Sequence, residues 1–152
     1  MQLLLSKVVQ MAGEKMKIKT ILIIDDSHLD RYIITEFLGS GGDYNYEFIE
    51  CSTVEQGLAV LDNLIPDCIL LDNIMPDSDM GGIKALPMIK DTINKLTPII
   101  MITGAPDDDA REIALSQGAS YFLDKTKIEP DMLNNLIVDL IEQNEAIRKM
   151  TA

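Results

Sequence analysis

The chain has 152 residues, a length typical of one domain, and 47% of them are hydrophobic, which is enough to form a core. Because 25 acidic residues outnumber 13 basic ones, the formal net charge is -12, which repels phosphate backbones and anionic lipid. The composition argues against a multidomain enzyme, a disordered chain and a protein that binds nucleic acid directly.

Cysteine usage and hydropathy predict the compartment. Cys51 and Cys68 stand in apolar stretches, which favours buried free thiols in a reducing environment. No run approaches the roughly 18 apolar residues of a membrane span, and residues 1–17 lack the features of a signal peptide. We therefore expect a cytoplasmic protein without a membrane contact.

The chain opens its regular structure with a strand and a helix. Residues 18–24 form an apolar, β-rich run that ends at Asp25, which is typical of a strand buried on both faces. A helix is expected next, until Gly39. Its apolar positions at helical spacing are Leu29, Tyr32, Ile33 and Phe37.

A second strand and helix follow, and then a third strand. Residues 46–51 are strand-like, and the following helix is expected to end at Pro66. The apolar face of that helix comprises Val54, Leu58, Leu61 and Ile65. Residues 68–71 predict the third strand, which leads directly into Asp72.

The alternation continues after a loop over residues 76–82. Pro87 is expected near the first turn of a helix that runs to about residue 93, because an interior proline costs ~3 kcal/mol or more. Residues 99–102 predict the fourth strand, and residues 107–117 predict the helix after it.

The last strand is predicted over residues 120–123, and Pro130 opens a long final helix. Its apolar positions are Leu133, Leu136, Ile137, Leu140 and Ile141. Five strands alternating with five helices predict an α/β fold: a five-stranded parallel sheet, doubly wound by helices on both faces. Such sheets bind ligands beyond the carboxyl ends of their strands.

Polar residues stand at four of these strand ends. Asp25 and Asp26 follow the first strand, Asp72 the third, Thr103 the fourth and Lys125 the fifth. Three converging carboxylates repel one another unless a cation lies among them, and an all-oxygen site suits Mg²⁺ or Ca²⁺. A hydroxyl and an ammonium aimed at the same place complete a site for a phosphoryl group.

In this order, the residues make the sequence similar to the receiver domain of two-component response regulators, over about residues 17–150. The matching segments are Ile-Ile-Asp25-Asp26-Ser, Leu-Asp72-Asn-Ile-Met75-Pro76, Ile-Thr103-Gly, and Lys125 seven positions after Gly118. The resemblance implies a flavodoxin-like (βα)5 receiver fold. Residues 1–16 would then be an N-terminal extension, and the spacing of Leu4, Val8 and Met11 in it fits a short amphipathic helix.

The resemblance implies a role for each acidic residue. Asp72 would accept a phosphoryl group from a sensor histidine kinase or a histidine phosphotransfer protein. Asp26, Asp72 and the backbone carbonyl of Ile74 would hold Mg²⁺, with Mn²⁺ or Ca²⁺ able to substitute. Asp25 would help through a metal-bound water.

The resemblance also implies a switch. Lys125 would pair with the phosphoryl group, and Thr103 would hydrogen-bond it and move on activation. Phe122 occupies the position of an aromatic residue that turns inward after the threonine moves. We therefore expect a phosphoacceptor signalling switch rather than an enzyme, catalysing only its own phosphorylation and dephosphorylation.

The expected output is a change in partner binding. We expect a stand-alone receiver that binds a downstream protein through the helix at residues 107–117, the strand at residues 120–123 and the final helix. A homodimer contact through the N-terminal extension and a relay role, in which the phosphoryl group passes to a histidine phosphotransfer protein, are equally compatible with the residues.

The sequence departs from the family at three places. The loop at residues 76–82 is one residue longer than usual, and Thr126 replaces the proline that commonly follows the lysine. Ile74 and Ala105 occupy positions that hold or exclude the hydrolytic water, and neither side chain can hydrogen-bond it. These two residues predict slow self-dephosphorylation.

Two other classes of α/β protein fit the sequence less well. A haloacid-dehalogenase-type phosphatase needs Asp-x-Asp at the first strand, where this chain has Asp25-Asp26-Ser27. A flavodoxin-like flavin binder needs a Ser/Thr/Gly-rich phosphate loop there, and the acidic residues would repel the flavin phosphate.

Overall fold

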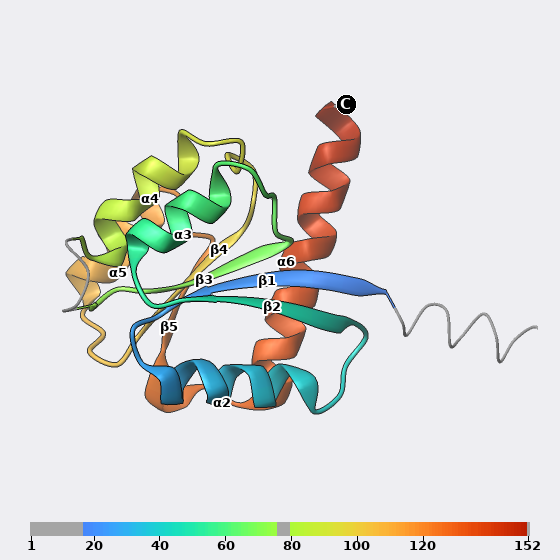
Figure 1. Cartoon of the computed structure of the whole chain (residues 1–152), viewed down its shortest axis with the longest axis horizontal. Helices are drawn as coiled ribbons and strands as arrows, with labels where there is room; N and C mark the ends of the chain where they lie inside the picture. The colour runs from blue at the N-terminus through green and yellow to red at the C-terminus, as the bar shows by residue number, and fades with distance from the viewer. Residues whose placement is uncertain (1–16, 76–79, 152) are drawn as a thin grey trace, which may run out of the picture.

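The computed structural model describes residues 17–75 and 80–151, and in them five strands form one parallel sheet in the order β2-β1-β3-β4-β5 (Figure 1). The strands are β1 (Ile18–Ile24), β2 (Asn45–Cys51), β3 (Cys68–Asp72), β4 (Ile99–Thr103) and β5 (Tyr121–Asp124). The predicted five-stranded parallel sheet is confirmed.

Helices cover both faces of this sheet. They are α2 (His28–Gly39), α3 (Val54–Leu61), α4 (Gly82–Lys90), α5 (Asp108–Ser116) and α6 (Pro130–Thr151), with a 3-10 turn η1 (Lys125–Lys127). Figure 1 shows α2 and α6 on one face of the sheet and α3, α4 and α5 on the other. The fold is therefore the doubly wound α/β arrangement that the sequence predicts.

The second half of β1, Ile21–Ile24, is a continuous apolar run because both faces of the strand are buried there. Ile21 and Ile23 pack in the core under α2 and α6, whereas Leu22 and Ile24 pack in the core under α3, α4 and α5. Successive side chains of a strand point to opposite faces, so a strand between two helical layers needs an apolar residue at every position.

Helices α3 and α4 differ from the expectation at Ile65 and Pro87. Helix α3 ends at Leu61, so Ile65 lies in the following loop and is 47% exposed. Helix α4 ends at Lys90 and carries Pro87 in its interior, not in its first turn. The reason is that Asn73 fixes the start of α4: its backbone carbonyl accepts from Gly82 N at 3.0 Å, and its side-chain oxygen accepts from Ile83 N at 3.3 Å.

In α2 the helical spacing was predicted correctly, but the buried face differs. Ile34 and Leu38 are the buried residues, whereas Leu29, Tyr32 and Ile33 are exposed. The apolar residues of this helix cover more than one face, so spacing alone could not show which of them meets the sheet.

Two other expectations can be compared with the described residues. Cys51 and Cys68 are both free and buried, as predicted. Within the described ranges, no helix is long and apolar enough to cross a membrane. The expected helix within residues 1–16 and part of the lengthened loop, residues 76–79, lie outside the described residues.

Candidate functional site

The carboxyl ends of β1 and β3 bring three aspartates together. Asp25, Asp26 and Asp72 each offer a carboxylate oxygen, and these oxygens lie within 4.8 Å of one another. Asp25 and Asp72 are buried, only 2% and 5% exposed. Strands β1 and β3 are parallel neighbours, with Ile24 opposite Leu71, so the residues that follow them must meet at one edge of the sheet.

Lys125 reaches this edge from the turn that follows β5. The Asp124 side chain accepts hydrogen bonds from the backbone N–H and the hydroxyl of Thr126, at 2.9 and 2.7 Å, which fixes the 3-10 turn η1. No peptide bond among the described residues is cis, so a trans bond joins Lys125 to Thr126. The turn therefore directs the lysine without the proline that is common in the family.

The Lys125 ammonium faces carboxylates from three elements. Its Nζ lies 2.8 Å from Oδ2 of Asp25, 2.8 Å from Oδ2 of Asp30 and 3.4 Å from Oδ2 of Asp72. Burial by itself lowers the pKa of Lys125, but the hydrogen bonds to Asp25 and Asp30 and the charge of Asp72 outweigh it and raise this pKa. The lysine therefore remains charged at neutral pH.

The charged form of Asp72, unlike that of Lys125, is disfavoured by its surroundings, because other carboxylates lie beside it. Burial, followed by the charge of Asp25, raises the pKa of Asp72 from 3.8 to about 6. Lys125 and the backbone N–H of Ile74 oppose this rise without cancelling it. A further positive charge near Asp72 would therefore stabilise its ionised form.

Backbone contacts hold Asp25 in place. One of its carboxylate oxygens accepts from the backbone N–H of Ser27 at 2.9 Å, and the other faces Lys125. The Arg31 guanidinium donates to the Asp25 carbonyl at 2.6 Å. The loop between β1 and α2 is therefore fixed at both of its ends.

The structure places the remaining predicted residues around this cluster. Thr103 is buried at the end of β4, opposite Asp124, and its hydroxyl accepts from the backbone N–H of Ala105 at 3.2 Å. Phe122 is buried in the core under α3, α4 and α5. The side chain of Ile74 is exposed. The roles of these residues in a switch stay predictions.

The aspartate cluster suits a divalent metal ion. Its ligands are carboxylate oxygens, which hard cations such as Mg²⁺ prefer, and two of the three carboxylates are buried. One ammonium cannot neutralise the carboxylates around it, which leaves a net negative charge at the site. The residues present therefore fit the Mg²⁺ site that the resemblance implies.

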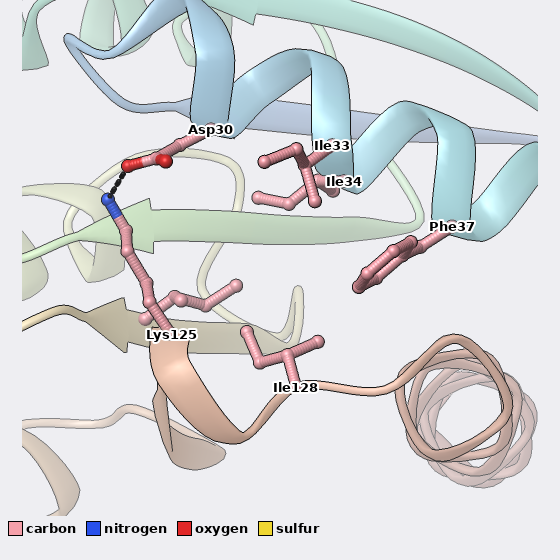
Figure 2. Close-up of a pocket in the computed structure, with 7 residues that line it drawn as sticks. Asp30, Ile33, Ile34, Phe37, Lys125 and Ile128 are labelled. Carbon is pink, nitrogen blue, oxygen red and sulfur yellow. Dashed lines mark hydrogen bonds and ion pairs between the residues drawn. The ribbon is translucent and has the colours of Figure 1, made fainter.

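Sequence reasoning missed Asp30. This residue lies in the first turn of α2, and Figure 2 shows its carboxylate paired with Lys125. The available signal was the Ser27-x-x-Asp30 spacing, which places an acidic residue at the third helical position. That spacing indicates a helix cap, and it does not show that the carboxylate turns away from the helix toward the end of β5.

Comparison with known proteins places this site in a family context. A family model described as the response regulator receiver domain matches residues 21–137 of the chain. That match contains each of the proposed site residues, from Asp25 to Lys125.

Two curated relatives illustrate the similarity. The chain is 35% identical over 108 residues to the phosphate regulon transcriptional regulatory protein PhoB of Pseudomonas aeruginosa, covering 70% of this chain and 45% of that protein. It is 29% identical over 128 residues to the autoinducer 2 sensor kinase/phosphatase LuxQ of Vibrio vulnificus, covering 84% of this chain and 14% of that protein. The chain thus spans less than half the length of either relative.

A solved structure shows the same fold. The CheY-like response regulator receiver domain protein of Methanospirillum hungatei superposes with a TM-score of 0.75 and 26% sequence identity. The superposition covers 86% of this chain and 98% of that one. Here the similarity extends over nearly the whole length of the relative.

Proposed function

Because this chain belongs to the response regulator receiver domain family, whose members are phosphoacceptor signalling switches, we propose that it accepts a phosphoryl group on Asp72. The donor is a sensor histidine kinase or a histidine phosphotransfer protein, and phosphorylation changes the affinity of this protein for a downstream partner.

The observation that carries this proposal is the setting of Asp72. Its carboxylate is buried at the end of β3, with the Lys125 ammonium 3.4 Å away and the carboxylates of Asp25 and Asp26 beside it. A carboxylate is a competent nucleophile toward phosphorus when cationic groups neutralise the charge on the phosphoryl oxygens. The site supplies a nucleophile, an ammonium and a set of metal ligands at one edge of the sheet.

The proposed reaction is a direct transfer. An Asp72 carboxylate oxygen attacks the phosphorus of a phosphohistidine, the new O–P bond forms as the P–N bond breaks, and the histidine nitrogen keeps the electron pair. Lys125 binds a phosphoryl oxygen and offsets its charge. A Mg²⁺ ion held by Asp26, Asp72 and the Ile74 carbonyl, with Asp25 acting through a bound water, would neutralise further charge.

The proposed switch begins at Thr103. A phosphoryl group adds negative charge and three strong acceptor oxygens, which attract the Thr103 hydroxyl. In the unphosphorylated structure the hydroxyl accepts from the Ala105 backbone N–H, so its own proton is available to donate when it moves toward these oxygens. This movement alters the loop after β4, and Phe122 on the neighbouring strand β5 occupies the space that is vacated.

We place the output surface on α5, β5 and α6. Ile113 and Leu115 of α5 and Tyr121 of β5 are large exposed apolar side chains on this surface. In this proposal, residues 17–150 pass on the signal by binding a partner protein there. The proposed location is the cytoplasm, where the buried thiols of Cys51 and Cys68 stay reduced.

The test is the intact mass of the protein after incubation with acetyl phosphate, with and without Mg²⁺. We expect a gain of about 80 Da, one phosphoryl group, that requires Mg²⁺ and is lost in Asp72→Asn. The matched control is Asp62→Asn, which removes an exposed aspartate just after α3. If neither acetyl phosphate nor a panel of phosphorylated histidine kinases adds this mass, the proposal fails.

A further inference from the structure

The ion pair between Asp30 and Lys125 has no part in the reaction proposed above. Asp30 lies in the first turn of α2, and Lys125 lies in the turn after β5, so the pair joins distant parts of the sequence (Figure 2). Its 2.8 Å distance is shorter than the 3.4 Å between the same ammonium and Asp72. The lysine expected to bind the phosphoryl group is thus held more closely by another carboxylate.

The local geometry explains why the Asp30 carboxylate is free to reach Lys125. Ser27 caps α2 by accepting a hydrogen bond from the Asp30 backbone N–H at 3.2 Å. In a reciprocal capping box, the side chain at the position of Asp30 would accept from the Ser27 backbone N–H. Here that N–H donates to Asp25 instead, at 2.9 Å, so the Asp30 carboxylate has lost its usual capping partner.

An apolar wall strengthens this ion pair. Asp30 and Lys125 line a cavity whose other lining side chains are apolar (Figure 2). They are Ile33, Ile34, Phe37, Ile102 and Ile128. Ions beside apolar surface are less screened by water than ions on an open surface, so the attraction between them is larger.

We propose that Asp30 is a positioning residue that competes with phosphorylated Asp72 for the Lys125 ammonium and holds the lysine back in the unphosphorylated state. An ammonium has three protons, and Asp25, Asp30 and Asp72 surround it. A phosphoryl group on Asp72 must draw the lysine toward itself against the attraction of Asp30. Asp30 therefore contributes to the free-energy difference between the unphosphorylated protein and the protein phosphorylated on Asp72.

This inference rests on the proposed function, and its test uses beryllium trifluoride, a phosphoryl mimic, at saturating Mg²⁺. In Asp30→Asn the competing charge is gone, so we expect the complex to bind about three- to tenfold more tightly than in the wild type. Asp30→Glu keeps the charge and should restore affinity toward the wild-type value. Asp131→Asn, which removes an acidic residue from the first turn of α6, is the control for a lost helix charge.

A crystal structure of Asp30→Asn without metal or beryllium trifluoride provides a second readout. We expect the distance from Lys125 Nζ to Asp72 Oδ2 to shorten from 3.4 Å toward that of a direct hydrogen bond. This measurement does not depend on phosphoryl chemistry. If the wild type binds no beryllium trifluoride, the proposed function fails, and the Lys125 position in the crystal alone decides the competition.

Several results would overturn the competition. An unchanged or weaker affinity in Asp30→Asn, with wild-type binding intact, shows that Asp30 is neutral or assists the lysine. An unmoved Lys125 in the crystal shows that Asp30 does not hold it back. An equal gain in Asp131→Asn assigns the effect to overall charge.

Discussion

Single charged side chains determine the chemistry of the site. Among them, Asp72 is the carboxylate whose ionised form is disfavoured by both burial and a neighbouring negative charge. It is buried, it lies beside Asp25, and its Lys125 partner is shared with two other carboxylates. Removing water and adding a like charge both disfavour the ionised form. The ionised form of Asp72, which the proposed phosphoryl transfer requires, is therefore disfavoured until more positive charge arrives.

The disfavoured charge of Asp72 gives a pH dependence to the stability of the metal-free protein. The pKa of Asp72 is raised from 3.8 to about 6, so in this pH interval the folded protein binds a proton that the unfolded chain has lost. The stabilising contribution of Asp72 is fully present below about pH 4 and is lost as the pH rises through about 6.

We therefore expect Asp72→Asn, measured in EDTA, to be more stable than the wild type at pH 7 by about 1–3 kcal/mol, because the buried charge is gone. Near pH 4 the advantage should disappear. Urea unfolding at several pH values measures it, with the exposed Asp139→Asn as the control. Parallel pH profiles for Asp72→Asn and the wild type would contradict the raised pKa.

The sequence predicted which residues lie at the site better than it predicted the contacts between their side chains. Asp25, Asp26, Asp72 and Lys125 follow predictable strands, so their meeting at one edge follows from the parallel sheet alone. Asp30 belongs to a helix turn, and its partner depends on which backbone N–H groups are already occupied. That information exists only in three dimensions.

Among the secondary-structure elements, α4 makes an unusually close contact with β3. Gly82, the first residue of α4, lies against the backbone of Asp72, and a Cβ atom at this position would overlap the Asp72 carbonyl oxygen. Backbone cannot move aside as a flexible side chain can. The absence of a side chain at Gly82 is therefore what lets the helix start directly beside Asp72, the proposed phosphoacceptor.

We expect Gly82→Ala to lower the free energy of unfolding by about 1–3 kcal/mol, because α4 and the end of β3 must separate. Displacing Asp72 should also slow its phosphorylation by acetyl phosphate. Urea unfolding and the rate of mass gain test these two effects. Gly39→Ala is the control, since a Cβ there meets nothing within 4 Å. Wild-type stability in Gly82→Ala would refute the close approach.

A buried polar residue joins two loops at the opposite edge of the sheet. Asn94 is fully buried, donates to the carbonyls of Leu61 and Leu64 at 2.9 and 2.8 Å, and accepts from the Thr97 hydroxyl at 2.8 Å. It therefore fixes the segment after α3 against the segment before β4. The Leu61 hydrogen bond is buried and the Leu64 hydrogen bond is partly buried. A buried carbonyl that loses its donor costs about 1–3 kcal/mol.

Asn94→Ala should therefore lower the free energy of unfolding by about 2 kcal/mol or more. Phosphorylation of the folded protein should be unaffected, because the acceptor site lies at the other ends of the strands. Chemical denaturation and intact mass measure the two quantities, and the exposed Asn63→Ala serves as the control. Equal stability of the two variants would show that the Asn94 network contributes little.

The prediction of elements succeeded where a single signal dominates. Apolar runs identified β1, β3 and β4, because a strand between two helical layers has no polar face. The edge strand β2 instead has exposed Asn45, Glu47 and Glu50 among its apolar residues. The helices were less certain at their ends and faces: Asn73 sets the start of α4, which leaves Pro87 in its interior, and Ile34 rather than Ile33 meets the sheet. Contacts with other elements decide such details.

For the whole molecule, a net charge of -12 works against compaction, and the aspartate cluster concentrates part of it at one edge. A cation affects this protein in two ways. Any salt screens the overall repulsion, whereas a divalent ion bound at the cluster of Asp25, Asp26 and Asp72 stabilises the folded state by an amount that grows with the logarithm of its concentration above the dissociation constant. Specific binding saturates with Mg²⁺ concentration and depends on single residues of the cluster. General screening depends on ionic strength and on no single residue.

We expect Mg²⁺ to raise the melting temperature by several degrees more than NaCl at equal ionic strength. A Mg²⁺ concentration of about one hundred times the dissociation constant adds about 2.7 kcal/mol to the free energy of unfolding. For a domain of this size, this raises the melting temperature by roughly 5–10 °C. Asp26→Asn removes a ligand on the surface of the cluster and should abolish the excess, leaving only the general salt effect. Thermal unfolding over a Mg²⁺ titration measures both. If Mg²⁺ and NaCl shift the wild type equally, the cluster holds no specific metal ion, and the charge at this edge is only partly compensated by Lys125.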